Sequence, residues 1–284
     1  MASQKHPDPF LEARVQTTDL SPNLLAVCAG YEVEKWRRDQ LVSHLVNWVP
    51  EFALSYSDYE AIGGHNAAEK TIEAAKALYA SPEYQRRGEC GELLLHVIVR
   101  QVFGSYPAIS KYFFKDSRND TVKGFDAVHV VANEHKLELW LGEVKFYKDI
   151  NQAIAAVVIE LKQHVDRDYL RSEFMAIKNK IDPSWPFAAR LAKLIHPQTS
   201  LDTIFDAVVV PVLLTYDSEC VNRHKKVTSA FQKAFEAEVF QHRESFAGKS
   251  LPKTVRLELF LFPLESKAQL VKSFDDRIKQ WQAL

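Results

Sequence analysis

The stretches GFDAVHVV at residues 124–131 and ELWLGEVKFY at residues 138–147 are two apolar runs separated by a short polar segment, NEHK at 133–136. Runs rich in valine, leucine and aromatic residues on either side of such a segment predict the two strands of a β-hairpin. Polar side chains inside these strands stand out against their apolar neighbours. They are therefore the first candidates for a functional site.

Three polar side chains of the hairpin are expected on one patch. Residues i and i+2 of a strand project from the same face, so Glu143 and Lys145 point together while Val144 and Phe146 point into the core. Asp126 lies near the start of the first strand, and a short hairpin can bring it beside Glu143. Two carboxylates and an ammonium on one patch form the outline of a metal site.

Magnesium is the cation that fits this patch. Hard cations take oxygen ligands and keep several waters, so two carboxylates, a main-chain carbonyl and substrate phosphate oxygens suffice to hold one. A cation held in this way lowers the pKa of a bound water and neutralises charge on a scissile phosphate. Lys145 can orient the nucleophile or stabilise the transition state. The patch therefore predicts phosphodiester hydrolysis with Mg²⁺, or with Mn²⁺ as a substitute.

The tripeptide Glu-x-Lys occurs four times in the chain, so its context has to decide. Glu134 lies in the predicted turn, Glu160 in a predicted helix where residues i and i+2 point apart, and Glu265 at a strand-to-helix junction. Glu143 alone lies in a predicted strand that follows another strand with an aspartate. The alternative is a solvated strand face with a surface ion pair.

Helices and strands alternate on both sides of the hairpin. The expected elements are a helix over about 89–103, strands near 111–115, 124–132 and 137–147, a helix over about 150–165 capped by Asp149, an irregular stretch containing DPSWP and HPQTS, a strand over 204–216, a helix over about 226–242, a strand over 255–262 and a helix from Ser266. This order predicts an α/β domain over 86–284 with a central mixed sheet flanked by helices. Residues 1–85 are expected to be a mainly helical extension, with Ser21-Pro22 as a helix start, that docks a partner.

The motifs resemble the PD-(D/E)xK nuclease superfamily, whose leading helix supplies a glutamate, one strand an aspartate and the next strand Glu-x-Lys. No proline precedes the aspartate here, because Gly124-Phe125 stands in its place. The resemblance covers about residues 86–265 and implies a restriction-endonuclease-like core. It implies the catalytic residues Asp126, Glu143, Lys145 and Glu92, with Glu89 as the alternative to Glu92, and the metal ligands Asp126, Glu143 and Glu92.

The segments RRGECGELLLHVIV, KGFDAVHV and LWLGEVKFY resemble more narrowly the HamA family, the nuclease subunit of the Hachiman anti-phage defence system. This resemblance implies an effector that degrades DNA beside a DNA helicase subunit. Two alternatives stay open. One is a stand-alone restriction or repair nuclease, and the other is a catalytically silent module that binds DNA or a partner.

Composition sets further limits. The formal net charge of −1 gives no global attraction to nucleic acid, so contacts with DNA must come from local patches. No apolar run is long enough for a membrane span and the N-terminal residues lack a secretory pattern, so a cytoplasmic protein without a membrane partner is expected. Three scattered cysteines predict neither a disulfide framework nor a zinc site.

Several other polar residues have an expected place. Glu92, His96 and Arg100 follow i, i+4, i+8 spacing on one helix, and a solvated or capping role is favoured for His96 and Arg100. Lys148, together with Gln152, follows the active strand closely enough to contact phosphate or to position a base. Asp206 is expected to start a strand.

Overall fold

The computed structural model describes residues 6–78, 88–109 and 124–283. Its strands are β1 Glu12–Gln16, β2 Asn23–Cys28, β3 Tyr31–Glu32, β4 Lys35–Trp36, β5 Tyr106–Pro107, β6 Ala127–Ala132, β7 Leu137–Phe146, β8 Val208–Asp217 and β9 Arg256–Leu264. Its helices are α1 Arg38–Asn47, α2 Val49–Ala53, α3 Tyr56–Glu60, α4 Ala67–Leu78, α5 Glu89–Phe103, α6 Ile150–His164, α7 Arg167–Lys180, α8 Ala188–Leu194, α9 Leu201–Phe205, α10 Glu219–Arg223, α11 Ser229–Ala247 and α12 Lys267–Gln282.

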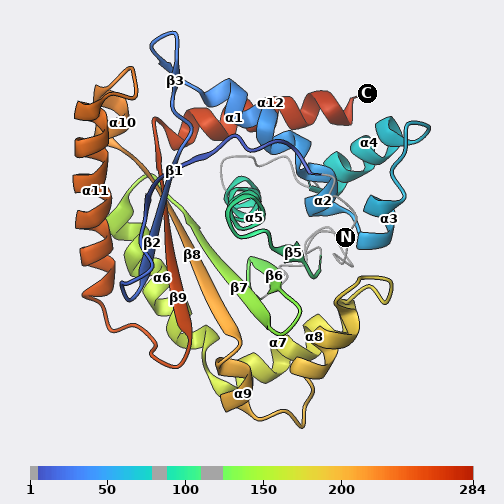
Figure 1. Cartoon of the computed structure of the whole chain (residues 1–284). Coiled ribbons are helices and arrows are strands. Elements are labelled where there is room, and N and C mark those ends of the chain that lie inside the picture. The colour runs from blue at the N-terminus through green and yellow to red at the C-terminus, as the bar shows by residue number, and fades with distance from the viewer. Residues whose placement is uncertain (1–5, 79–87, 110–123, 284) are drawn as a thin grey trace.

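Within these residues, seven strands form one mixed sheet in the order β1-β2-β9-β8-β7-β6-β5 (Figure 1). The four central strands, β2, β9, β8 and β7, run parallel, and the strands at the two edges run antiparallel to their neighbours. Strands β3 and β4 pair in a separate hairpin. The predicted central mixed sheet flanked by helices is confirmed.

The elements around the predicted site match the sequence closely. Helix α5 has the predicted bounds, and β6 and β7 form the predicted hairpin, closed by Asn133, whose side-chain oxygen accepts hydrogen bonds from the backbone of the turn. The predicted cap is also present, because the Asp149 side chain accepts a hydrogen bond from Gln152 N. The helix expected from Ser266 begins there as α12, and the Ser266 side chain accepts a hydrogen bond from Gln269 N. The strand expected at 111–115 lies outside the described residues.

Three expectations need correction. Ser21-Pro22 lies between β1 and β2 and starts no helix, because residues 24–28 are an almost fully buried run that pairs with β9 as a central strand. Residues 12–16 and 23–28 are therefore strands of the sheet, while helices α1 to α4 follow as expected. The boundary near residue 85 lies outside the described residues.

Asp206 ends α9 rather than starting β8, and α8 fills part of the stretch expected to be irregular.

Helices cover both faces of the sheet. One face packs against α5, α1 and α12, and the other packs against α6, α7 and α11 (Figure 1). The side chains of β7 alternate between these layers, so Val144 and Phe146 face α5, whereas Leu139 and Leu141 face the layer of α6. Glu143 therefore lies beneath helices rather than on an open strand face. Among the described residues, no helix is long and apolar enough to cross a membrane.

The close approach of α5 to β7 requires glycine at position 91. A Cβ there would lie 2.8 Å from Phe146 Cβ and 2.9 Å from Val144 Cγ1. Neither atom is the far end of a flexible side chain, so the helix would have to move away from the strand. Gly91 thus sets the spacing between α5 and the strand that carries Glu143.

Gly91→Ala is expected to destabilise the protein by about 1–3 kcal/mol, because overpacking outweighs the gain of roughly 1 kcal/mol in helix propensity. Urea denaturation measures this difference. The matched control is Gly64→Ala, where a Cβ would meet nothing within 4 Å. Equal stabilities of the two variants would contradict the close-packing argument.

A buried polar network ties α2 to α5 and β6. His96 Nε2 and Arg100 Nε each donate to Glu51 Oε2 at 2.9 Å, and Arg100 Nη2 donates to Glu51 Oε1 at 2.8 Å. His96 Nδ1 lies 3.2 Å from His129 Nε2, whose ring contacts Ser105 Oγ at 2.9 Å. His96 and Arg100 are 1% and 4% exposed, so the expectation that they are solvated is wrong.

Glu51→Gln is expected to lower the free energy of unfolding by about 3–5 kcal/mol, because it leaves the buried Arg100 guanidinium without its counter-charge. Burial opposes the charge of Glu51, yet the hydrogen bond from His96 and the charge of Arg100 lower the pKa of Glu51 to about 2. The stabilisation is therefore present above pH 4.5, the ordinary pKa, and is lost as the pH falls toward 2.

Thermal unfolding between pH 7 and pH 3 tests both statements. The wild type should lose the Glu51 contribution on acidification, whereas Glu51→Gln should not. Glu60→Gln, on the exposed α3, is the control and should differ from wild type by less than about 0.5 kcal/mol. A Glu51→Gln curve parallel to that of the wild type would contradict the assigned charge state.

Candidate active site

The β6–β7 hairpin places Asp126 opposite Glu143. Ala127, the first residue of β6, pairs with Gly142 of β7 in the antiparallel register. Asp126, one residue before Ala127, therefore lies opposite Glu143, one residue after Gly142. Asp126 N donates to Gly142 O at 2.8 Å, and Val144 N donates to Asp126 Oδ2 at 2.9 Å. The backbone therefore fixes the Asp126 carboxylate beside the strand that carries Glu143, as the sequence predicts.

Glu143 is buried, with only 1% of its surface exposed. Its Oε1 forms an ion pair with His164 Nδ1, and its Oε2 lies 3.9 Å from Lys145 Nζ. Burial and the negative charge of Asp126 raise the pKa of Glu143 to about 7, although His164 and Lys145 oppose the rise. The nearby cations therefore only partly balance the charge on this carboxylate.

Lys145 lies on the same face of β7 as Glu143, and its ammonium contacts two carboxylates. Its ammonium contacts Glu143 and forms a shorter ion pair with Glu160 of α6, and it also donates to Val144 O at 3.2 Å. Burial opposes its charge, but the hydrogen bond to Glu160 and the charge of Glu143 raise the pKa of Lys145. The side chain therefore remains an ammonium at neutral pH.

Helix α6 supplies two residues that sequence reasoning did not select, Glu160 and His164. Glu160 was set aside because its own Glu-x-Lys lies on a helix, yet the residue pairs with the lysine of the other tripeptide. The two residues are one turn apart on a helix that directly follows the Glu-x-Lys strand. That i, i+4 spacing is the signal that could have identified them.

Aromatic rings hold the imidazole of His164 in place. Tyr169 stacks on it with ring centroids 4.6 Å apart and an interplanar angle of 13°, and Phe125 meets it edge-on at 5.0 Å. Burial lowers the pKa of His164, but the hydrogen bond and the charge of Glu143 outweigh it and raise the pKa overall. The ring is thus rigid and favours its protonated form.

The structure places Glu92, the third predicted carboxylate, in the first turn of α5. This helix packs on the face of β7 that carries Val144 and Phe146, whereas Glu143 projects from the other face. In the described part of the chain, no group of three or more histidine, cysteine, aspartate and glutamate side chains is arranged to hold a metal ion. Asp126 and Glu143 are the predicted ligands that lie together, and the role of Glu92, like that of Glu89, stays a prediction.

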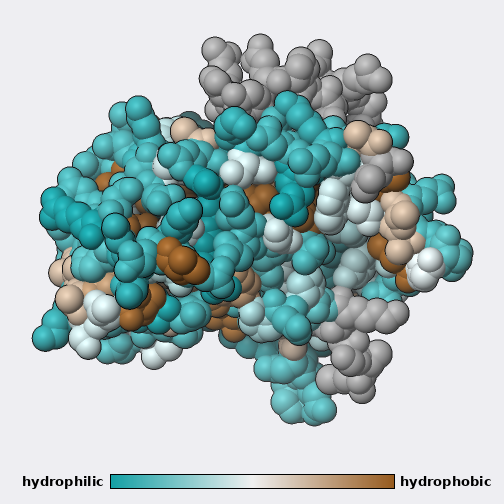
Figure 2. Space-filling view, turned by 90° about the horizontal axis from the view of Figure 1, so that it is seen from above, coloured by the Kyte–Doolittle hydropathy of each residue, from teal (hydrophilic) through white to brown (hydrophobic). Residues whose placement is uncertain are grey.

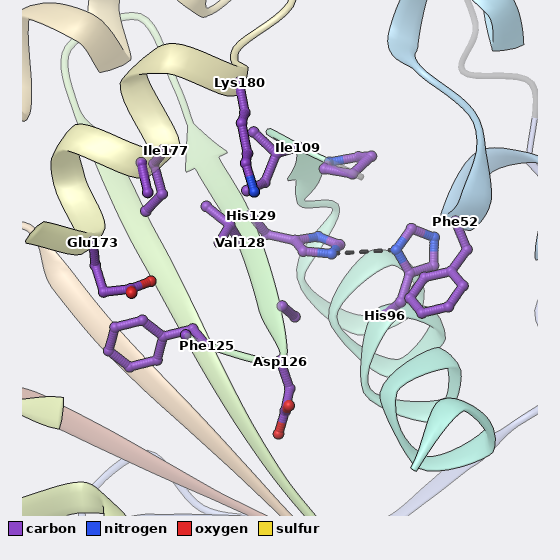
Figure 3. A pocket seen from close by; sticks show the side chains of 14 residues that line it. Phe52, His96, Ile109, Phe125, Asp126, Val128, His129, Glu173, Ile177 and Lys180 are labelled. Atoms are coloured by element: carbon purple, nitrogen blue, oxygen red, sulfur yellow. Dashed lines mark hydrogen bonds between the residues drawn. The ribbon is translucent and has the colours of Figure 1, made fainter. Parts of the chain in front are cut away.

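A small cavity adjoins Asp126 at the edge of the sheet. Figure 3 shows Asp126, just before β6, and His129 on β6, with Glu173 of α7 on one side and His96 of α5 on the other. The volume of this cavity is about 50 Å³, whereas pockets for small organic ligands measure roughly 300–1,000 Å³. It has room for about one or two waters and does not fit a nucleotide.

Glu143→Gln is expected to change how stability depends on pH when divalent cations are absent. The native pKa of Glu143, about 7, lies above the ordinary value of 4.5, so wild-type stability should fall as the pH rises from 4.5 to 7. Glutamine has no such charge, so the variant should gain stability relative to wild type above pH 7 and not at pH 4.

Thermal unfolding in EDTA at pH 4, 6 and 8 measures this difference. Glu134→Gln, an exposed residue of the β6–β7 turn, is the control and should show no trend. If the difference between Glu143→Gln and wild type is the same at all three pH values, the buried charge is balanced and the assignment is wrong.

The HamA family model matches residues 5–278. No match is found among the curated proteins. The matched range includes α5, the β6–β7 hairpin and α6, which carry the segments predicted to resemble this family. The match covers nearly the whole chain and confirms the prediction: the chain belongs to the HamA family of Hachiman-type anti-phage defence proteins.

Proposed function

We propose that this protein is a metal-dependent DNA nuclease of the PD-(D/E)xK type, the effector subunit of a Hachiman anti-phage complex that also contains a DNA helicase. The observation that carries the proposal is the buried Glu143 carboxylate, which faces Asp126 across two paired strands and has Lys145 on the same face. Family membership supports the defence role and the helicase partner. The geometry supports the nuclease chemistry.

The donor set suits a hard divalent cation. Asp126 and Glu143 offer carboxylate oxygens, the ligands that Mg²⁺ and Mn²⁺ take. Burial and the charge of Asp126 raise the pKa of Glu143 despite His164 and Lys145, which supports the binding of a further cation beside it. Asp126 and Glu143 would hold the ion, with Glu92 as the predicted third ligand. A bound Mg²⁺ supplies a water of lowered pKa and neutralises charge on the scissile phosphate.

Each remaining side chain has a separate task in this proposal. Lys145, held between Glu143 and Glu160, donates to a phosphate oxygen and stabilises the charge that develops there. Glu160 positions that ammonium. His164 holds Oε1 of Glu143, so Oε2, which lies 3.9 Å from Lys145 Nζ, is the oxygen that would bind the cation. The rings that pack against His164 restrict its rotation.

DNA degradation by the full chain with Mg²⁺ or Mn²⁺, alone and with the co-encoded helicase, tests the proposal. Glu143→Ala and Lys145→Ala should each lower the cleavage rate by at least about 100-fold, the usual effect of removing one electrostatic contact to the transition state. The matched controls are Glu134→Ala and Lys136→Ala. They alter another Glu-x-Lys, which lies in an exposed turn, and should cleave like wild type.

Each other result has a definite meaning. Cleavage that survives Glu143→Ala would place the chemistry elsewhere. Absence of cleavage by wild type, even with the helicase and unwound DNA, would favour a silent module that binds DNA or a partner. Strict dependence on one recognition sequence, without any helicase, would favour a stand-alone restriction nuclease.

A further inference from the structure

Two lysines meet where the strand of the candidate active site ends. Lys148 follows β7 by two residues, and its backbone carbonyl accepts a hydrogen bond from Asp217 N at 3.0 Å, which ties it to the end of β8. Lys267 is the first residue of α12, directly after β9. In Figure 1, α12 begins at the carboxyl end of the parallel strands. Figure 2 looks onto this end, whose surface is mostly hydrophilic.

The ammonium of Lys267 is fixed over aromatic rings of the active strand. Its Nζ lies 5.1 Å from the centroid of the Phe146 ring and 5.8 Å from that of Tyr147. The residue is half-buried. Burial lowers the pKa of Lys267, Asp217 opposes that effect, and the positive charge of Lys148 lowers the pKa further. The two lysines lie side by side because both bind Asp217: Asp217 N donates to Lys148 O at 3.0 Å, and Asp217 Oδ1 accepts from Lys267 N at 2.6 Å.

The nearby carboxylates are bound to backbone amides. Asp217 Oδ1 accepts a hydrogen bond from Lys267 N at 2.6 Å, and Asp149 Oδ1 accepts one from Gln152 N at 2.8 Å. Among the described residues, neither Lys148 nor Lys267 forms an ion pair with a carboxylate. An anion from outside the chain would therefore find two neighbouring positive charges that no ion pair within the described part of the chain balances.

Other lysines of the same helix behave differently. Lys272 pairs with Asp276 at 2.6 Å, and Lys279 pairs with Asp275 at 2.7 Å, each one turn along α12. Ordinary surface lysines of α12 therefore find a carboxylate on their own helix. Lys267 is placed over aromatic rings instead, beside a second cation.

We propose that Lys148 and Lys267 form a phosphate-binding site that grips the DNA backbone next to the scissile phosphate. The inference rests on the proposed nuclease function and extends it to substrate binding. Lys148 is five residues beyond Glu143, at most about 16 Å along an extended chain. A duplex advances about 3.4 Å per nucleotide, so the bound phosphate belongs within roughly five nucleotides of the cleaved one.

Phosphate is the anion that this geometry favours. Two point charges side by side match the spread negative charge of a phosphodiester, and lysine binds phosphate through charge rather than through a fixed fork of donors. The chain as a whole is nearly neutral. A local pair of cations next to the active strand is therefore the kind of patch that a DNA-binding protein of this composition needs.

The salt dependence of DNA binding tests the proposal. The full chain is titrated with a short fluorescent duplex in EDTA, so that binding is measured without cleavage, at 50 and 200 mM salt. Each phosphate contact contributes about 0.9 to the slope of log affinity against log salt. The site binds one phosphate, so the slope of the Lys148→Gln/Lys267→Gln variant should be smaller by about 0.9. Between 50 and 200 mM salt, the fold loss of affinity should therefore be about 3.5 times smaller for this variant than for wild type.

The control variant, Lys272→Gln/Lys279→Gln, removes the same number of positive charges, both from α12, and should keep the wild-type slope. Equal slopes for wild type and for Lys148→Gln/Lys267→Gln, in a protein that binds and cleaves DNA, would overturn the phosphate site alone. A wild type that neither binds nor cleaves DNA would overturn the proposed function as well. If the slope of log affinity against log salt falls equally in both double variants, the effect comes from net charge alone, and the site is overturned.

Discussion

The burial of the Glu143 carboxylate between a sheet and its covering helices is the constraint on which the rest of the site depends. A carboxylate with 1% exposure must be balanced by charges fixed in the fold. Here the balance comes from His164 of α6 and Lys145 of β7, while the negative charge of Asp126, just before β6, opposes it. In our proposal, a divalent cation bound by Asp126 and Glu143 supplies the remaining positive charge.

The surrounding fold fixes the positions of these charges. Asp126 forms two hydrogen bonds with the backbone of β7, one through its N–H and one through its carboxylate. The close contact at Gly91 holds α5 against the opposite face of β7. The network around Glu51 extends this support, because it joins α2 to α5 and to the strand of Asp126. The N-terminal residues thus contribute to the layer behind the site as well as to the sheet, through β1 and β2.

Local patterns predicted the features that local physics determines. Two apolar runs around a polar turn identified the hairpin, alternation placed Glu143 and Lys145 on one face, and a cap residue identified the start of α6. Partners distant in sequence escaped prediction: His96 and Arg100 are buried because Glu51, more than 40 residues earlier, folds onto them. His164 meets Glu143 only after α6 packs back on β7. Strand β2 was missed because its partner β9 lies more than 200 residues away, and β1 was missed with it because, among the described strands, β1 pairs only with β2.

Direct titration of the full chain with Mg²⁺ or Mn²⁺, by calorimetry without DNA, tests the central claim that Asp126 and Glu143 form a metal site. The account predicts saturable binding by wild type that raises the free energy of unfolding, by about 2.7 kcal/mol at 100 times the dissociation constant. Asp126→Asn and Glu143→Gln should each abolish that binding. Unchanged binding in both variants, or absence of binding by a folded wild type, would contradict the account.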